Sequence, residues 1–271
     1  MEPKPTIDNQ TYMIRNISLS PIIYQATQPF PYAKQDDILE LSYALALQEE
    51  ILSIPAEAWD RYQNPFEAKY TLRDKCNFPP LLRGLFEQLE SKEFIEQLSL
   101  LSGYRLLPDP TRNFWGVHTY QPGDKLDIHV DAGRHPTTLQ KKRVTLGIYL
   151  SANWKEEYGC ELEIWKGTSA ASSDARLIEK VDAIAPMFNR LILFTCTDAA
   201  WHGNPEPVEG PPEAKRIFLT MSYLSENESE DKNQRTKAYF VARPNDPVDE
   251  EKDKLRLLRA DPERYKDIYR V

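Results

Sequence analysis

Residues 120–131 read YQPGDKLDIHVD, and this stretch decides how the rest of the chain is understood. In an extended strand, alternate side chains lie on the same face. A strand over 126–130 therefore brings the imidazole of His129 and the carboxylate of Asp131 together on one face. The stretch predicts two groups of metal-ligand type at the end of a strand.

A third group of this type is His202, which follows the apolar strand candidate RLILFTC at 190–196. Two imidazoles and one carboxylate that cover one face of an octahedron leave the other positions open, an arrangement typical of non-haem Fe(II) oxygenases. An H-x-D pattern alone has little value, because a histidine in a strand is more often an ordinary polar residue. With the basic pair at 215–216 farther along the chain, the three residues predict one metal centre.

The order of these motifs resembles the Fe(II)/2-oxoglutarate-dependent dioxygenase superfamily, and the details resemble its prolyl 4-hydroxylase-like branch. The resemblance runs from about residue 114 to residue 224. It rests on ordered matches at family-like spacing, namely Tyr120 and the Pro-Gly turn at 122–123 before HVD, VTLGIYLSANW at 144–154, EYGCELEIW at 157–165, FNRLILF at 188–194 and RIFLTMSYLS at 216–225.

The resemblance implies an enzyme with His129, Asp131 and His202 as its catalytic and metal-binding residues. It implies Fe(II), 2-oxoglutarate as cosubstrate and O2, and it leaves a need for ascorbate open. The protein then fixes the positions of the ligands and excludes water, while the metal carries out the oxidation. Related halogenases carry a small residue in place of this carboxylate, so Asp131 favours hydroxylation.

Arg216 is the expected anchor for the far carboxylate of 2-oxoglutarate, because a guanidinium presents a rigid fork of donors that suits a carboxylate. Lys215 is the competing anchor, but in a strand it faces away from Thr220. The resemblance also assigns Tyr120 and Tyr149 to positions whose hydroxyls contact 2-oxoglutarate, although a tyrosine in a strand is more often a packing residue. Thr220 completes the expected cosubstrate-binding set, and no substrate-binding residue is assigned.

From residue 113 onward, short apolar or alternating runs separated by turn residues indicate β-structure. The runs lie at 114–120, 126–130, 144–150, 160–165, 177–184, 190–195, around His202 and at 216–224. About eight strands suit a double-sheet jelly roll. In the last run, one face is expected to line the pocket, and it carries Arg216, Phe218, Thr220 and Ser222. The other face is expected to join the core, and it carries Ile217, Leu219 and Met221.

The region before residue 113 predicts helices that brace the sheet. Apolar spacing predicts one helix after residues 36–37, a second that begins at 79–80, and a third that is capped by Ser91 and ended by Gly103. EAKYTLR at 67–73 is a strand candidate, and the prolines before residue 32 predict only short extended pieces.

The expected fold class is α+β and mainly β. Its core is expected to be a double-stranded β-helix, that is, a cupin-like jelly roll, braced by N-terminal helices and followed by a partly helical C-terminal tail.

We divide the chain into three regions within a single structural domain. They are a support region of helices and a strand at 1–112, an oxygenase core at 113–225, and a charged linker with a C-terminal extension at 226–271. The extension holds a strand candidate at 238–242 and a helix-prone end at 250–271, and its charged start is a candidate linker or lid.

Other residues near the motifs have ordinary roles as the default interpretation. His118 shares strand parity with Tyr120 and is a candidate to line the pocket, whereas His135 is expected to be a polar loop residue. Trp201 is expected to pack, with a role in shaping the pocket as the alternative. LQKKR at 139–143 is interpreted as a solvated loop before a strand.

Composition narrows the class of protein and its partners. Of 271 residues, 41% are hydrophobic and 28% charged, which is ordinary for a globular protein, and neither a membrane span nor a signal peptide is visible. We expect a cytoplasmic protein without a membrane partner. The net charge of -8 argues against nucleic acid as the main partner.

The expected state of the three cysteines, Cys76, Cys160 and Cys196, is a reduced thiol. Cys160 stands where related sequences carry a glycine.

Three functional classes follow, and the oligomeric state is left open. The leading one is a dioxygenase that hydroxylates an unactivated C-H bond, with a prolyl residue of a protein or peptide as substrate. The alternative is a hydroxylase of a small molecule, such as a free amino acid or a pathway intermediate. The third is a non-catalytic jelly-roll binding module, for which iron binding without succinate formation is the distinguishing observation.

Overall fold

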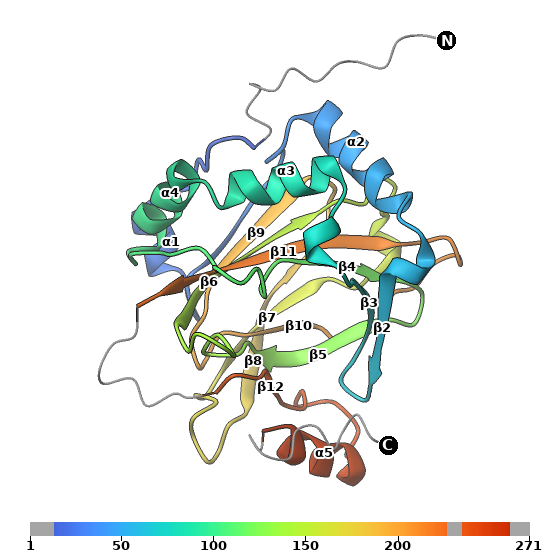
Figure 1. Ribbon diagram of the computed structural model, residues 1–271. Coiled ribbons are helices and arrows are strands. Elements are labelled where there is room, and N and C mark those ends of the chain that lie inside the picture. The colour runs from blue at the N-terminus through green and yellow to red at the C-terminus, as the bar shows by residue number, and fades with distance from the viewer. Residues whose placement is uncertain (1–13, 227–234, 261–271) are drawn as a thin grey trace, which may run out of the picture.

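The computed structural model describes residues 14–226 and 235–260, and its centre is one curled antiparallel sheet (Figure 1). The strands are β1 (Tyr32–Gln35), β2 (Trp59–Asn64), β3 (Glu67–Leu72), β4 (Gly116–Tyr120), β5 (Lys125–Val130), β6 (Lys141–Tyr149), β7 (Leu162–Gly167), β8 (Leu177–Ile184), β9 (Arg190–Thr195), β10 (Trp201–Asn204), β11 (Arg216–Ser225) and β12 (Tyr239–Phe240). Their order is β1-β9-β6-β11-β4-β3-β5-β10-β7-β8, while β2 pairs with β3 and β12 pairs with β5.

Strand β3 joins the two halves of the sheet. One part of it pairs with β4, at Tyr70 and Thr71, and the other part pairs with β5, at Glu67 and Ala68. The sheet therefore curls into a half-barrel whose interior is lined from both halves. The mainly β, jelly-roll fold class predicted from the sequence is confirmed.

Helices cover the outside of the sheet. They are α1 (Pro21–Ala26), α2 (Leu41–Leu52), α3 (Pro80–Leu89), α4 (Lys92–Ser102) and α5 (Glu250–Ala260), with three short 3₁₀ turns, η1 (Ala56–Ala58), η2 (Lys75–Asn77) and η3 (Glu156–Tyr158). Helices α1 to α4 lie over the part of the sheet that contains β6, β9 and β11, whereas α5 lies at the opposite end of the molecule, beyond β12 (Figure 1).

The ends of α4 follow from its sequence. The Ser91 side chain accepts a hydrogen bond from the Phe94 amide at 3.2 Å, which satisfies a donor that the first helical turn leaves open. Gly103 adopts φ 77°, a left-handed conformation that ends the helix and that glycine reaches without steric cost. The predicted boundaries of this helix are confirmed.

The two faces of β11 separate core from cavity, as its alternation predicts. Ile217, Leu219 and Met221 belong to the apolar core between the sheet and the helices. The opposite face lines the interior of the half-barrel. On this interior face, a Cβ atom at Gly147 would lie 2.1 Å from the Phe218 ring, so glycine here makes room for that ring above β6.

Most elements match the prediction, and the start of the chain does not. All eight strands predicted after residue 113 are present, as are β3, β12, α2, α3, α4 and the first part of the C-terminal helix. The expectation of only extended pieces before residue 32 is wrong, because α1 forms there: Ser20 caps it, and Pro21 occupies the first turn, where a missing N-H costs nothing. Strands β1 and β2 are not predicted.

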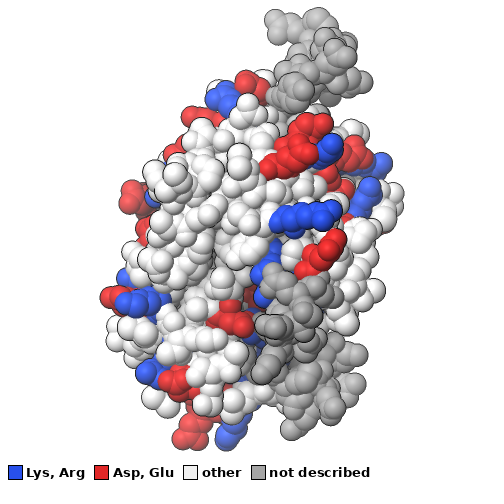
Figure 2. Space-filling view, turned by 90° about the vertical axis from the view of Figure 1, so that its left-hand side faces the viewer, with Lys and Arg blue, Asp and Glu red and all other residues white. Residues whose placement is uncertain are grey.

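Some expectations fall on residues outside the described ranges. These are the extended pieces at 1–13, most of the charged linker at 227–234, and the end of the C-terminal helix at 261–271. Among the described helices, none has the length and apolar character needed to cross a membrane. The three cysteines are free thiols, as expected. On the face shown in Figure 2, charges of both signs are interspersed and broad areas carry neither.

Candidate active site

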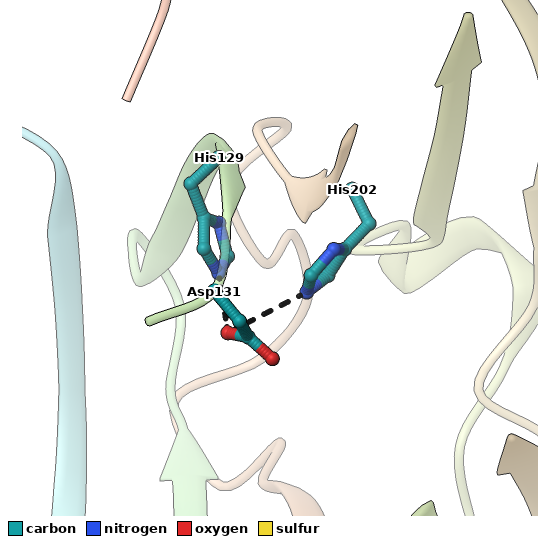
Figure 3. Close-up of side chains that lie close together, drawn as sticks. All are labelled: His129, Asp131 and His202. Atoms are coloured by element: carbon teal, nitrogen blue, oxygen red, sulfur yellow. Dashed lines mark ion pairs between the residues drawn. The ribbon is translucent and has the colours of Figure 1, made fainter. Parts of the chain in front are cut away.

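His129 and His202 meet because β5 and β10 are paired. They are direct partners in the register of these antiparallel strands, so their side chains leave the sheet on the same face. Asp131 follows β5 directly and lies on the His129 side, as the alternation predicts. The structure thus brings together the three residues predicted to form one metal centre (Figure 3).

The ligand-type atoms of these residues converge. The His129 Nε2 lies 3.5 Å and the His202 Nε2 lies 4.0 Å from Asp131 Oδ1. Both Nδ1 atoms are turned away, His129 toward the Asp127 carbonyl and His202 toward the Ala200 carbonyl, each at 2.9 Å. Because an Nδ1-H donates to each carbonyl, each Nε2 carries a free lone pair that points to the site.

Burial keeps His202 neutral. Desolvation and the neighbouring His129 lower the pKa of His202 to about 4. Aromatic rings flank both imidazoles, with Phe194 4.4 Å from the His202 ring and Phe240 5.2 Å from the His129 ring, measured between centroids. At neutral pH this imidazole is therefore available as a ligand, in surroundings that exclude water on one side.

The second oxygen of Asp131 has its own partners. Lys142 Nζ lies 2.7 Å and Thr145 Oγ1 lies 3.2 Å from Asp131 Oδ2. Burial alone would raise the pKa of Asp131, but the Lys142 ammonium and the two imidazoles hold it well below its usual range. The interpretation of 139–143 as a solvated loop is therefore wrong for Lys142, which lies buried in β6 and pairs with a carboxylate that the local sequence does not reveal.

One cavity of about 510 Å³ contains this centre and extends along the interior of the half-barrel. Its walls include every residue predicted for the metal and cosubstrate sites: His129, Asp131, His202, Arg216, Tyr120, Tyr149 and Thr220. His118 also lines it, as its parity with Tyr120 predicts. Trp201 is absent from these walls and packs in a separate apolar cluster, where its Nε1 donates to the Thr168 carbonyl at 2.8 Å.

Arg216 is a buried cation with incomplete hydrogen bonding. Its guanidinium contacts Asn204 Oδ1 at 3.2 Å, Cys160 Sγ at 3.3 Å and Tyr149 Oη at 3.5 Å, and its Nε has no partner. Among the described residues no carboxylate forms an ion pair with it. A buried charge without a counter-ion is costly, so an arriving carboxylate would be strongly favoured here.

The neighbours of Arg216 explain two features of the sequence. Tyr120 and Tyr149 place their rings 4.4 Å and 5.1 Å from the guanidinium carbon, so both tyrosines are packing partners of the cation. Cys160 adopts φ 55°, a left-handed conformation that favours glycine, and its thiol reaches the guanidinium. Lys215, the competing anchor, is exposed and lies outside this cavity.

Thr220 and Asn204 complete the polar lining between the metal centre and Arg216. Thr220 Oγ1 donates to the Leu146 carbonyl at 3.1 Å. Asn204, which sequence reasoning missed, lies two residues after His202 in β10 and bonds to both Arg216 and the Cys160 carbonyl. Two residues of strand span about 7 Å, a distance that a short dicarboxylic acid can bridge. The donor set therefore fits Fe(II) at one end and a carboxylate at the other.

His135 is not part of this site. It is fully buried, its Nδ1 accepts hydrogen bonds from the Thr137 and Thr138 amides, and its Nε2 faces Thr111 and Asp109. The expectation that it is an ordinary satisfied polar residue is confirmed.

Comparison with known proteins agrees with this arrangement. Residues 115–224 match the family model of the 2OG-Fe(II) oxygenase superfamily. No curated protein matches the chain. An oxidoreductase of the 2OG-Fe(II) oxygenase family from Burkholderia pseudomallei is similar in structure, with a TM-score of 0.55 and 13% identity, over 83% of this chain and 100% of that chain.

Two prolyl hydroxylases share the fold as well. One, from Trichoplax adhaerens, was solved with a peptide fragment of the hypoxia inducible factor oxygen degradation domain; the TM-score is 0.54 and the identity 16%, over 75% of this chain and 87% of that chain. The other, a prolyl-4-hydroxylase from Pseudomonas putida, has a TM-score of 0.51 and 13% identity, over 76% of this chain and 99% of that chain. The resemblance predicted from the sequence is therefore confirmed: residues 115–224 match the 2OG-Fe(II) oxygenase model, and the fold is similar to those of prolyl hydroxylases.

Proposed function

We propose that this protein is a 2-oxoglutarate-dependent dioxygenase that hydroxylates an unactivated C-H bond, with a prolyl residue of a protein or peptide as the leading substrate. The observation that carries the proposal is the presence, in one cavity, of a His-Asp-His cluster and a buried arginine without a counter-ion. Either feature alone has a structural explanation. Together they match a metal and a dicarboxylate that bind side by side.

Each residue has a defined task in this proposal. His129, Asp131 and His202 hold Fe(II), which with 2-oxoglutarate and O2 supplies the oxidation of the C-H bond. Arg216 binds the far carboxylate of 2-oxoglutarate. Tyr149 lies within 3.5 Å of Arg216 and restricts the pocket around that carboxylate.

Tyr120 and Thr220 form the remaining walls of the proposed cosubstrate pocket. The Tyr120 ring covers the guanidinium on one side. Thr220 lies on the same face of β11 as Arg216. The Tyr120 ring excludes water from the interaction between the guanidinium and the carboxylate, which strengthens it.

The shape of the cavity supports a peptide substrate. Beyond the metal cluster, its walls continue to Asp60 on β2 and to Arg73 after β3, and both residues are exposed. The site is therefore reached from the surface along β2 and β3, and a residue of a longer chain can enter while the rest of that chain stays outside.

A second substrate class, a small acidic metabolite, is favoured by the charges of the same cavity. Lys69 and Lys75 line it in addition to Arg216 and Lys142. Lys75 Nζ has a carbonyl partner, Asn113 O at 2.6 Å, and its pKa is lowered by burial. Lys69 and Lys142 already pair with Glu67 and Asp131, so Lys75 is the ammonium that suits the carboxylate of a free amino acid or a pathway intermediate.

The proposal is tested by turnover of the cosubstrate. With Fe(II), 2-oxoglutarate and O2, the wild-type protein should form succinate, and a panel of proline-containing peptides and free amino acids should reveal which class gains an oxygen atom by mass spectrometry. Arg216→Met should weaken 2-oxoglutarate binding by roughly 10- to 100-fold, because hydrogen bonds to a charged group are lost.

Lys215→Met is the matched control, since Lys215 neighbours Arg216 in sequence but is exposed. It should bind 2-oxoglutarate like the wild type. Well-folded protein that binds iron but forms no succinate with any substrate class would contradict the enzymatic proposal and leave a jelly-roll binding module.

A further inference from the structure

The two oxygens of Asp131 differ in their surroundings. Oδ1 faces the imidazoles, 3.5 Å from His129 Nε2 and 4.0 Å from His202 Nε2. Oδ2 faces away from them, 2.7 Å from Lys142 Nζ and 3.2 Å from Thr145 Oγ1. The carboxylate is thus held with one oxygen toward the metal centre and the other already engaged by the protein.

Lys142 is the stronger of the two partners on Oδ2. The Thr145 hydroxyl has a single proton and is also near Cys196 Sγ at 3.3 Å and Ser222 Oγ at 3.2 Å. Both hydrogen bonds have an ionised acceptor, but the lysine ammonium makes the shorter one and adds the attraction of an opposite charge, which the hydroxyl lacks. Lys142 therefore contributes most of the force that fixes the orientation of the carboxylate.

The position of Lys142 is fixed by the sheet. It lies in β6 opposite Leu224 of β11, and its amide donates to the Gly133 carbonyl at 3.0 Å. Its side chain is 8% exposed, and its ammonium lies 5.0 Å from the Phe114 ring. The free-energy cost of removing the ammonium from water is offset here, because the ammonium has both a carboxylate and an aromatic face as partners.

We propose that Lys142 is a positioning residue that limits Asp131 to one metal-binding oxygen and so keeps a coordination position free for 2-oxoglutarate. The inference rests on the proposed function. A ligand set with three donor atoms leaves the opposite face of an octahedral ion open. A carboxylate that binds through both oxygens occupies one more position, and the cosubstrate then competes with it.

Lys142→Met removes the charge and retains most of the length of the side chain. Metal binding should persist, because the three ligands remain, whereas the affinity of the metal-loaded protein for 2-oxoglutarate should fall at least ~10-fold, the usual scale for loss of a group that orients a ligand. Binding of Mn(II) is measured from the signal of the free ion in electron paramagnetic resonance, and 2-oxoglutarate binding by anaerobic titration of the Fe(II)-loaded protein.

Two further variants separate this role from a general structural one. Lys142→Arg keeps a cationic donor and should restore 2-oxoglutarate binding to near the wild-type value. Lys141→Met changes the preceding lysine of β6, which does not line the cavity, and should bind both ligands like the wild type. If Lys142→Met loses Mn(II) and 2-oxoglutarate to the same extent, the residue stabilises the fold and the inference is wrong.

A cobalt spectrum distinguishes action through Asp131 from direct contact with the cosubstrate. Co(II) bound to Lys142→Met should differ from Co(II) bound to the wild type in its visible ligand-field bands before any 2-oxoglutarate is added. An unchanged spectrum, or unchanged 2-oxoglutarate affinity, overturns the inference while the proposed function stands. A wild-type protein that binds neither metal nor cosubstrate contradicts the proposed function itself.

Discussion

At the scale of single residues, the site depends on side chains oriented by their own backbone. His129 and His202 each donate from Nδ1 to the carbonyl of the residue two positions earlier. The strand that carries each imidazole therefore also selects its tautomer. This arrangement leaves each Nε2 ready for a metal without any other side chain.

The buried, neutral state of His202 predicts how stability depends on pH. Its pKa is lowered to about 4 in the folded protein, so between that pH and the ordinary value the unfolded chain binds more protons. Stability therefore rises with pH in this window. Without metal, the free energy of unfolding should fall by about 2 kcal/mol between pH 7 and pH 5 through this residue alone.

Chemical denaturation of the metal-free protein at both pH values measures this effect. His118, whose pKa burial also lowers, adds to the total in the same direction. His202→Gln isolates the contribution of His202, because the variant should lose about 2 kcal/mol less than the wild type over the same interval. Equal losses in both proteins would mean that His202 is not a buried neutral group.

At the scale of elements, β5 is held from several sides. It pairs with β10, β3 and β12, and Asp127 within it forms ion pairs with Lys125 and with Lys252 of α5, at 2.7 Å and 2.6 Å. The described part of the C-terminal extension thus packs on the strand that carries His129. It supports the strand that carries His129 but does not line the cavity.

Phe240 of β12 provides a test of this support. Its ring lies 5.2 Å from the His129 ring and 5.0 Å from the Phe66 ring. Phe240→Ala should lower the free energy of unfolding by roughly 3 kcal/mol, because it leaves a cavity in a buried cluster. It should also weaken metal binding by about 10-fold, since His129 loses the ring that restricts it.

Tyr239→Ala is the control for the same strand. Tyr239 contacts the Trp201 ring and not that of His129, so this variant should bind Mn(II) with nearly the wild-type affinity. Calorimetric titration with Mn(II) compares the two. A similar loss of affinity in both would show that β12 matters only as a strand and that the Phe240 ring has no specific role.

Gly203 controls the distance between the two metal-binding strands. A Cβ atom at this position would lie 2.7 Å from the Asp127 carbonyl oxygen of β5. Gly203→Ala should therefore push β10 away from β5, cost roughly 1–3 kcal/mol of stability, and separate His202 from His129. Loss of metal affinity with a modest fall in melting temperature is the expected result, and an unchanged metal affinity would contradict it.

At the scale of the whole molecule, alternation along strands made much of the fold and site predictable. The alternation of β11 separates Arg216 from Ile217, and the H-x-D spacing places His129 beside Asp131. Pairing between distant strands was not predictable in this way. That β5 lies beside β10, and that β3 joins both halves, depends on tertiary contacts which no local pattern encodes.

Lys142 shows the same limit for a single charge. A lysine in LQKKR is solvated by default, because a buried ammonium is costly without a partner. Its partner, Asp131, lies across the loop at 132–140 and becomes visible only when the fold brings β5 and β6, which do not pair with each other, close in space. Composition and periodicity of the sequence therefore do not reveal which charged residues the fold buries as pairs.

His129, Asp131, His202 and Arg216 are proposed to form a single Fe(II) and 2-oxoglutarate site. Anaerobic addition of both ligands to the metal-free protein tests it through the weak visible charge-transfer band of the chelate. We expect a band in the wild type and in Lys215→Met, no band in His202→Ala, and a band that needs much more 2-oxoglutarate in Arg216→Met. A folded wild-type protein without the band, or a His202→Ala variant with an undiminished one, would contradict it.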